Sequence, residues 1–129
     1  MNNGAIDYKS LVKSYLDAFE ARDTERCMTF FTEDSSIDFQ NTVYKGLEQV
    51  RDWHKDRFEA NLRLTKLEGI LVKGTTVKVD CVAASDRLSA WNVKALPGRL
   101  TVKFEGDKVK EGKLEARLMN VFDLLRSGE

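Results

Sequence analysis

The chain has few of the residues that break, cross-link or divide a fold. Its 129 residues include one proline, Pro97, and two cysteines, Cys27 and Cys81. With a single proline and no Gly/Ser-rich linker, the chain offers no natural domain boundary. We therefore expect one domain over residues 1–129. The two cysteines lie far apart among apolar neighbours and match no metal-ligand spacing, so we expect both to be reduced and buried.

The chain also lacks a long apolar run and an excess of charge of either sign. No stretch approaches the roughly 18 apolar residues that a membrane span requires. Residues 1–7 have neither a basic start nor an apolar core, which argues against a signal peptide and favours a cytoplasmic location. Lys plus Arg and Asp plus Glu number 21 each. This balance removes the main electrostatic basis for binding nucleic acid or an anionic membrane. We expect small molecules or other protein chains as partners.

Histidine is equally scarce, since His54 is the only one. One histidine and two separated cysteines leave no set of side chains with metal-ligand spacing, so neither a metal nor a cofactor is expected. No nucleophile-elbow motif of a Ser/His/Asp hydrolase is present either. Any chemistry must therefore come from ordinary side chains in a pocket.

The first half of the chain is predicted to be helical. Residues 7–21 place apolar side chains at the i, i+3, i+4, i+7 spacing of a helix with one buried face. Asp23 is predicted as the N-cap of a second helix, because its carboxylate can accept hydrogen bonds from free backbone N–H groups. This second helix is expected from about residue 24 to about residue 32.

A third helix follows two short strands, expected at 35–39 and 42–44, and a connection that ends at Gly46. We expect this helix over residues 47–61. One stripe of it runs at spacings of three and four residues: Val50, Trp53, His54, Arg57, Phe58 and Asn61.

The second half of the chain changes to a period of two, which is typical of strands. Strands are expected at 67–73, 77–85, 100–105 and 109–118, with hairpin turns at Gly74 and Gly106. We expect residues 86–98 to be irregular and residues 119–126 to form a short helix. Helices followed by a strand meander predict an α+β fold. In it, three N-terminal helices cover a strongly curved antiparallel sheet, with a cone-shaped hollow between the layers.

Three segments carry a family resemblance: YLDAFEARD (15–23), FFTEDSSI (30–37) and YKGLEQVRDW (44–53). With them the chain resembles the nuclear transport factor 2-like superfamily, in particular its SnoaL-like and ketosteroid-isomerase-like members. The resemblance implies the cone-shaped α+β barrel and a homodimer formed through the outer face of the sheet. The superfamily contains isomerases, dehydratases, cyclases, epoxide hydrolases and non-enzymatic binding modules, so the fold does not select among these activities.

The resemblance assigns residues position by position. Tyr15 matches the tyrosine that donates to the oxyanion in the ketosteroid isomerases. The position of their aspartate base holds Phe39, and Asp38 comes one residue earlier. In a strand, an offset of one residue reverses the face, so Asp38 is expected to point away from the pocket unless a bulge intervenes. Ordinary ketosteroid isomerase activity is therefore not expected.

His54 and Tyr15 are the candidate catalytic residues. A histidine in an apolar pocket can act as a general acid or base, and a tyrosine hydroxyl can polarise a carbonyl oxygen. The structural alternative is a histidine bonded to a backbone or carboxylate partner and a core tyrosine bonded to a neighbouring side chain. The candidate ligand-binding residues are Trp53, Phe39, Arg57, Phe58 and Trp91. Arg57 could hold a ligand carboxylate, extend to solvent or pair with a carboxylate of the sheet.

Two functional hypotheses follow from the sequence. The first is an enzyme that isomerises, dehydrates or cyclises a small apolar carbonyl compound by proton transfer, without a cofactor. The second is a non-catalytic domain of the same fold that binds a small apolar molecule or another protein. The absence of the aspartate base favours the second, whereas a histidine in the pocket would favour the first.

Overall fold

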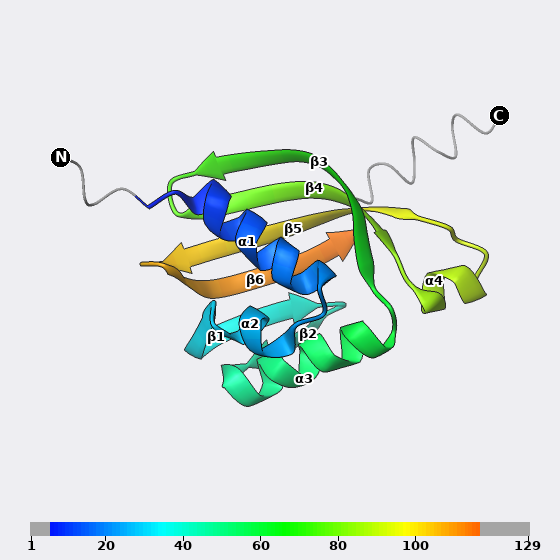
Figure 1. Cartoon of the computed structure of the whole chain (residues 1–129), viewed down its shortest axis with the longest axis horizontal. Helices are drawn as coiled ribbons and strands as arrows, with labels where there is room; N and C mark the ends of the chain where they lie inside the picture. Colours follow the sequence, from blue (N-terminus) through cyan, green and yellow to red (C-terminus); the bar gives the residue numbers. More distant parts are fainter. Residues whose placement is uncertain (1–5, 117–129) are drawn as a thin grey trace.

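The computed structural model describes residues 6–116, and it contains four helices and six strands within that range (Figure 1). Helices α1, α2 and α3 cover one face of a curved sheet, and α4 lies at one end of the molecule between β4 and β5. The elements are α1 (Tyr8–Glu20), α2 (Thr24–Met28), β1 (Phe31–Phe39), β2 (Thr42–Lys45), α3 (Gly46–Glu59), β3 (Arg63–Lys73), β4 (Thr76–Ala84), α4 (Asp86–Ala90), β5 (Leu96–Glu105) and β6 (Lys108–Ala116).

The first two helices begin where an aspartate caps them. Asp7 accepts a hydrogen bond from the backbone N–H of Ser10, and Asp23 accepts one from that of Arg26, both at 3.1 Å. The predicted cap at Asp23 is thus confirmed. The predicted end of α2 near residue 32 is wrong, because the helix stops at Met28 and β1 begins at Phe31. The aromatic and β-branched run at residues 29–32 favours an extended backbone over further helical turns.

The sheet has the strand order β2-β1-β6-β5-β4-β3. Every neighbouring pair is antiparallel except β1 and β6, which are parallel. The α+β fold and the curved sheet are as predicted, and the expectation of a wholly antiparallel sheet is corrected at this one pair. Apolar alternation shows which face of a strand is buried but not the direction of its neighbour.

The hairpin turns are confirmed at Gly74 and Gly106, whose φ angles of 63° and 61° lie in the left-handed region that favours glycine. Three strands begin about four residues earlier than predicted, at Phe31, Arg63 and Leu96, and residues 86–90 form α4 in the stretch expected to be irregular. The pairing of β3 with β4 shifts register twice, between Leu64 and Lys66 and between Leu67 and Gly69. These shifts interrupt the alternation by which the start of β3 would have been recognised.

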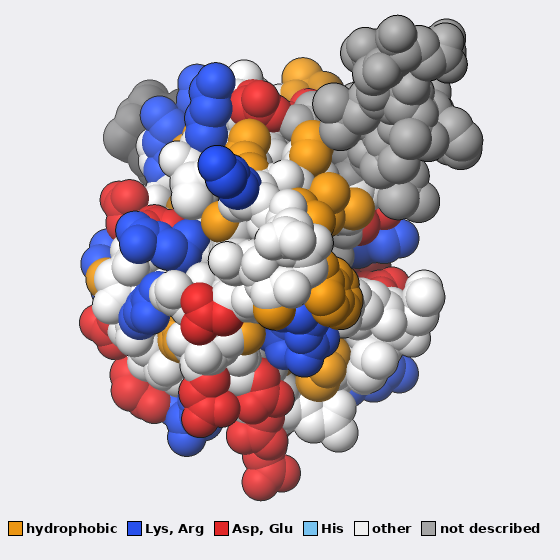
Figure 2. Space-filling model, turned by 90° about the vertical axis from the view of Figure 1, so that its right-hand side faces the viewer, with side chains coloured by type: hydrophobic (Ala, Val, Ile, Leu, Met, Phe, Trp, Pro, Cys, Tyr) orange, Lys and Arg blue, Asp and Glu red, His pale blue; other side chains and the backbone are white. Residues whose placement is uncertain are grey.

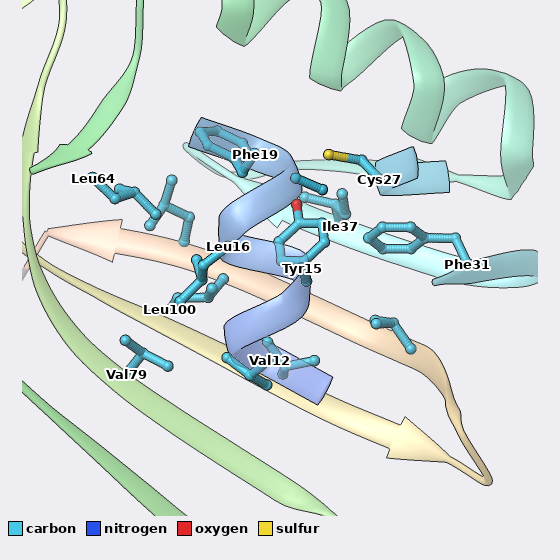
Figure 3. Close-up of a cluster of buried hydrophobic side chains, with 14 of the residues drawn as sticks. Val12, Tyr15, Leu16, Phe19, Cys27, Phe31, Ile37, Leu64, Val79 and Leu100 are labelled. Carbon is cyan, nitrogen blue, oxygen red and sulfur yellow. The ribbon is translucent and has the colours of Figure 1, made fainter. Parts of the chain in front are cut away.

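The core lies between the helices and the inner face of the sheet, and Figure 3 shows part of it around α1. Tyr15, Leu16 and Phe19 of α1 lie in this cluster beside Ile37 of β1. Cys27 and Cys81 are both buried and unbridged, as predicted. The predicted helix at 119–126 and the end of the last predicted strand lie outside the described residues.

Candidate functional site

The stripe of α3 that contains the candidate residues enters two different environments. His54 lies in the closed core and is 0% exposed. The Tyr15 hydroxyl oxygen lies 2.7 Å from His54 Nε2, and His54 Nδ1 lies 2.8 Å from the carbonyl oxygen of Val50. A carbonyl can only accept, so Nδ1 carries the proton and Nε2 accepts from the tyrosine. Both ring nitrogens of His54 are thus bonded within the protein.

Aromatic rings surround this histidine. The centroid of its ring lies 4.9 Å from that of Trp53, 5.4 Å from that of Phe31 and 6.1 Å from that of Phe58. Burial in this apolar environment lowers the pKa of His54 to about 4, although the bond to Val50 acts in the opposite direction. Burial also raises the pKa of Tyr15 well above its ordinary value. Both members of this core pair, Tyr15 and His54, are therefore neutral near pH 7.

The space beside the core pair is small. A void of about 20 Å³ borders Tyr15 and Trp53 and is otherwise lined mostly by apolar side chains. This volume admits about one water molecule. A carbon skeleton can reach the core pair only if the surrounding side chains move.

A much larger cavity, of about 370 Å³, opens near the C-terminal end of α3. Six structural elements and their connections border it: the helices α3 and α4 and the adjoining ends of β1, β4, β5 and β6. Figure 2 looks at this end of the molecule, where hydrophobic side chains lie next to basic ones. The lining residues are Asp38, Phe39, Gln40, Asn41, Arg57, Ala60, Leu62, Ala83, Ser85, Arg87, Leu88, Trp91, Leu96, Pro97, Gly98, Lys113, Leu114, Glu115 and Ala116. We call it the large cavity.

Arg57 is the half-buried cation of the large cavity. Its guanidinium carbon lies 4.7 Å from the centroid of the Phe39 ring, which is a cation–π geometry. Its Nε is buried, and within residues 6–116 no hydrogen-bond partner reaches that atom. Burial lowers the pKa of Arg57, and the positive charge of Arg87 acts in the same direction, whereas Tyr44 and Asp56 act in the opposite direction. The basic character of the cavity is therefore not neutralised by a bonded carboxylate on Arg57.

Two acidic residues border the large cavity from the strands. Asp38 pairs in register with Lys113 of β6, while Phe39 pairs with buried Leu114. Lys113 forms an ion pair with Glu115, at 3.8 Å. Paired residues of neighbouring strands share a face, so the side chains of Asp38 and Glu115 lie on the face opposite to Phe39 and Leu114. The register thus places the Asp38 side chain on the outer face of β1, while the residue still borders the large cavity.

The candidate residues thus fall into two groups. Phe39, Arg57 and Trp91 border the large cavity, and Trp91 is 67% exposed at its rim. Tyr15, His54 and Trp53 lie in the core. Phe58 packs against Phe19, with ring centroids 5.0 Å apart, and borders neither cavity.

The sequence suggested that residues 86–98 rim the pocket as an irregular stretch, and it did not predict that part of this stretch forms the helix α4. Arg87 and Leu88 of this helix line the large cavity. The signal was present in Ser85, whose hydroxyl oxygen accepts a hydrogen bond from the backbone N–H of Leu88 at 3.2 Å and so caps the helix.

Several solved structures share this fold. A protein of unknown function with a cystatin-like fold from Xanthomonas campestris has a TM-score of 0.75 at 14% identity, covering 87% of this chain and 92% of its own. A proposed SnoaL-like polyketide cyclase from Shewanella denitrificans has a TM-score of 0.72 at 17% identity, covering 92% and 96%. A ketosteroid-isomerase-like protein from Catenulispora acidiphila, in complex with trimethylamine, has a TM-score of 0.67 at 15% identity, covering 81% and 82%.

The fold is therefore that of the nuclear transport factor 2-like, SnoaL-like and ketosteroid-isomerase-like proteins, as the sequence predicted. At such identities the likeness concerns the fold alone. No protein-family profile matches the sequence, and no curated protein sequence matches it. Among residues 6–116, no helix is long and apolar enough to span a membrane, and no three potential metal ligands are grouped. The homodimer through the outer face of the sheet stays a prediction.

Proposed function

We propose that this protein is a small-molecule-binding domain whose ligand occupies the large cavity. The observation that carries the proposal is the cavity itself: about 370 Å³, with apolar and polar residues in its lining and one half-buried cation at one end of α3. Ligand sites are commonly concave and apolar, with a few polar groups that fix orientation. Leu62, Leu88 and Leu114 supply apolar walls, and Trp91 supplies a flat surface at the rim.

The second candidate is the cofactor-independent proton transfer suggested by the sequence, with His54 moving the proton and Tyr15 polarising the oxygen. Its support is the 2.7 Å contact between these two side chains. The geometry favours binding over this reaction, because His54 is 0% exposed and both of its ring nitrogens are bonded. A general base must come within hydrogen-bond reach of the proton it removes.

Binding is tested with N-phenyl-1-naphthylamine, a neutral apolar dye whose fluorescence rises in an apolar environment. We expect saturable binding that Ala83→Phe weakens by about tenfold or more, because the added ring occupies part of the large cavity. Ala84→Phe is the matched control: this neighbour lies one residue away along β4 and does not line the cavity. Equal dye binding by both variants would contradict the proposal, and so would failure of both the dye and smaller naphthalene probes to bind.

Proton transfer is tested with 2-tetralone, an apolar ketone with exchangeable α-protons. We expect the protein to leave the rate of deuterium exchange at the α-carbon, followed by NMR, at the rate in buffer. An acceleration that His54→Gln removes while the variant keeps its circular dichroism spectrum would establish the enzymatic candidate instead.

A further inference from the structure

We propose that the ligand of the large cavity is a carboxylate with a flat apolar body, and that Arg57 binds its carboxyl group. This inference rests on the proposed function, and it adds the chemical class of the ligand. It starts from an observation on the described residues: a basic side chain borders the cavity, and its buried Nε has no hydrogen-bond partner among residues 6–116.

The first observation concerns the atoms of Arg57. Its Nε is buried and has no hydrogen-bond partner within residues 6–116. Buried polar groups in proteins are nearly always bonded, so each exception calls for a partner from outside the chain or for a specific explanation. A carboxylate can accept two parallel hydrogen bonds from one guanidinium, and it also supplies the missing charge.

The second observation concerns the position of the guanidinium. Its contact with the Phe39 ring, at 4.7 Å, places it against an apolar surface and holds it at the border of the cavity. Phe39 also packs edge-on against Trp53, with ring centroids 5.6 Å apart. The platform under Arg57 is therefore fixed by the core. A positioned guanidinium loses less freedom on binding than a mobile one.

The third observation concerns the local charge. Arg87 also borders the cavity, and its positive charge repels that of Arg57, whereas the carboxylate of Asp56, which does not line the cavity, attracts it. Asp38, Lys113 and Glu115 border the cavity too, but their register places all three side chains on the face of the sheet opposite to Phe39 and Leu114. Binding an anion therefore relieves repulsion between two arginines, whereas binding a cation would increase it.

The carboxylate is expected to be attached to a flat apolar body. Trp91 exposes a large aromatic surface at the rim, and Leu88 and Leu114 line the wall. A ligand with its carboxylate on Arg57 and its flat body toward Trp91 would contact first the basic group and second the apolar surface of the cavity. Small inorganic anions would use only the first.

The test compares two probes of nearly equal shape, 2-naphthoate and its neutral analogue 2-naphthamide, by isothermal titration calorimetry on the full chain. We expect the carboxylate to bind at least about tenfold more tightly than the amide, in keeping with hydrogen bonds to a charged group. Arg57→Met should remove this preference, because methionine keeps much of the side-chain length without the charge. Lys55→Met is the matched control, since it removes one exposed cation of the same helix that does not line the cavity.

Arg57→Lys provides a second test that does not depend on the folding of the methionine variant. It keeps the charge but loses the fork that matches a carboxylate, so the preference should fall at least about threefold. Equal binding of both probes, or an unchanged preference in Arg57→Met or Arg57→Lys, would overturn the inference while leaving the cavity as a binding site. Binding of the neutral dye with no binding of either naphthalene probe would overturn it as well. Failure of all three compounds to bind would overturn the proposed function itself.

Discussion

Two polar side chains on one face of α3 have opposite fates. His54 is fully buried and bonded at both ring nitrogens. Arg57, three residues further on, is half-buried, and its Nε has no hydrogen-bond partner in the described part of the chain. Helix α3 directs both side chains toward the space between the helices and the sheet. Packed side chains enclose His54, whereas the large cavity opens beside Arg57. A polar residue in an apolar stripe therefore stabilises the core where all of its polar atoms have hydrogen-bond partners. Where one of these atoms lacks a partner, the residue becomes a candidate for binding a ligand.

The largest effect expected is on stability, from truncating the histidine of the core pair. His54→Ala should lower the free energy of unfolding by about 3–4 kcal/mol, because it leaves a void among packed rings and an unbonded Tyr15 hydroxyl. Urea denaturation followed by circular dichroism measures the change. Lys55→Ala, at the next and exposed position of α3, should change the free energy by less than about 0.5 kcal/mol. A similar small change in His54→Ala would mean that the core pair contributes little.

The second expected effect is a loss of stability in mild acid. The pKa of His54 is lowered from 6.5 to about 4 in the folded protein, so the unfolded chain binds the proton more tightly. The stabilisation is fully present above pH 6.5 and is lost as the pH falls toward 4. Between pH 7.5 and pH 5 the free energy of unfolding should fall by about 2 kcal/mol.

His54 is the only histidine in the chain, which makes this window simple to interpret. His54→Gln should remove most of the pH dependence between pH 7.5 and pH 5, measured by urea denaturation at each pH. Equal stability of the wild-type protein at both pH values would show that the pKa of His54 is the same in the folded and unfolded chain. Solvent access to the core pair would explain that result.

The third expected effect comes from the other member of the core pair. Tyr15→Phe should lower the free energy of unfolding by about 1–2 kcal/mol, because it leaves His54 Nε2 buried without a donor. Tyr8→Phe is the matched control. The Tyr8 hydroxyl donates to the carbonyl oxygen of Gly106 at the surface, at 3.3 Å, and its loss should cost less than about 0.5 kcal/mol. An equal loss of unfolding free energy in the two variants would show that the buried bond of Tyr15 contributes no more than the exposed bond of Tyr8.

The smallest effect on stability is expected at the large cavity. Arg57→Met should change the free energy of unfolding by less than about 0.5 kcal/mol, because the lost contact with Phe39 is offset by the removal of a partly desolvated charge. The same urea denaturation measures it. A loss of more than about 1.5 kcal/mol would show that Arg57 stabilises the fold, and it would argue against a role in ligand binding.

Much of the fold could be predicted from local patterns. The stripe of α3, the cap at Asp23 and the turns at Gly74 and Gly106 are each decided by a few neighbouring residues. The wrong predictions concern properties of a strand that depend on the neighbouring strand, namely its direction and its register. Whether β1 lies parallel or antiparallel to β6 depends on a strand about 70 residues away in the chain, and the start of β3 is obscured by its two register shifts against β4.

The candidate site was predictable in its residues but not in its grouping. Helical spacing placed Trp53, His54 and Arg57 on one inward stripe, and strand alternation placed Phe39 on the inner face. The spacing could not show that a tyrosine from α1 would occupy Nε2 of the histidine. It also could not show that α4 would bring Arg87 to the cavity.

The sequence by itself thus determined the α+β class, the positions of the helices and most turns, and which side chains face inward. These properties depend on periodicity and on the backbone preferences of single residues. Only the tertiary structure decided that the inward stripe passes from a closed core at His54 to an open cavity at Arg57. The physical reason is that burial and bonding depend on what the other layers place opposite each side chain, and those residues come from distant parts of the chain.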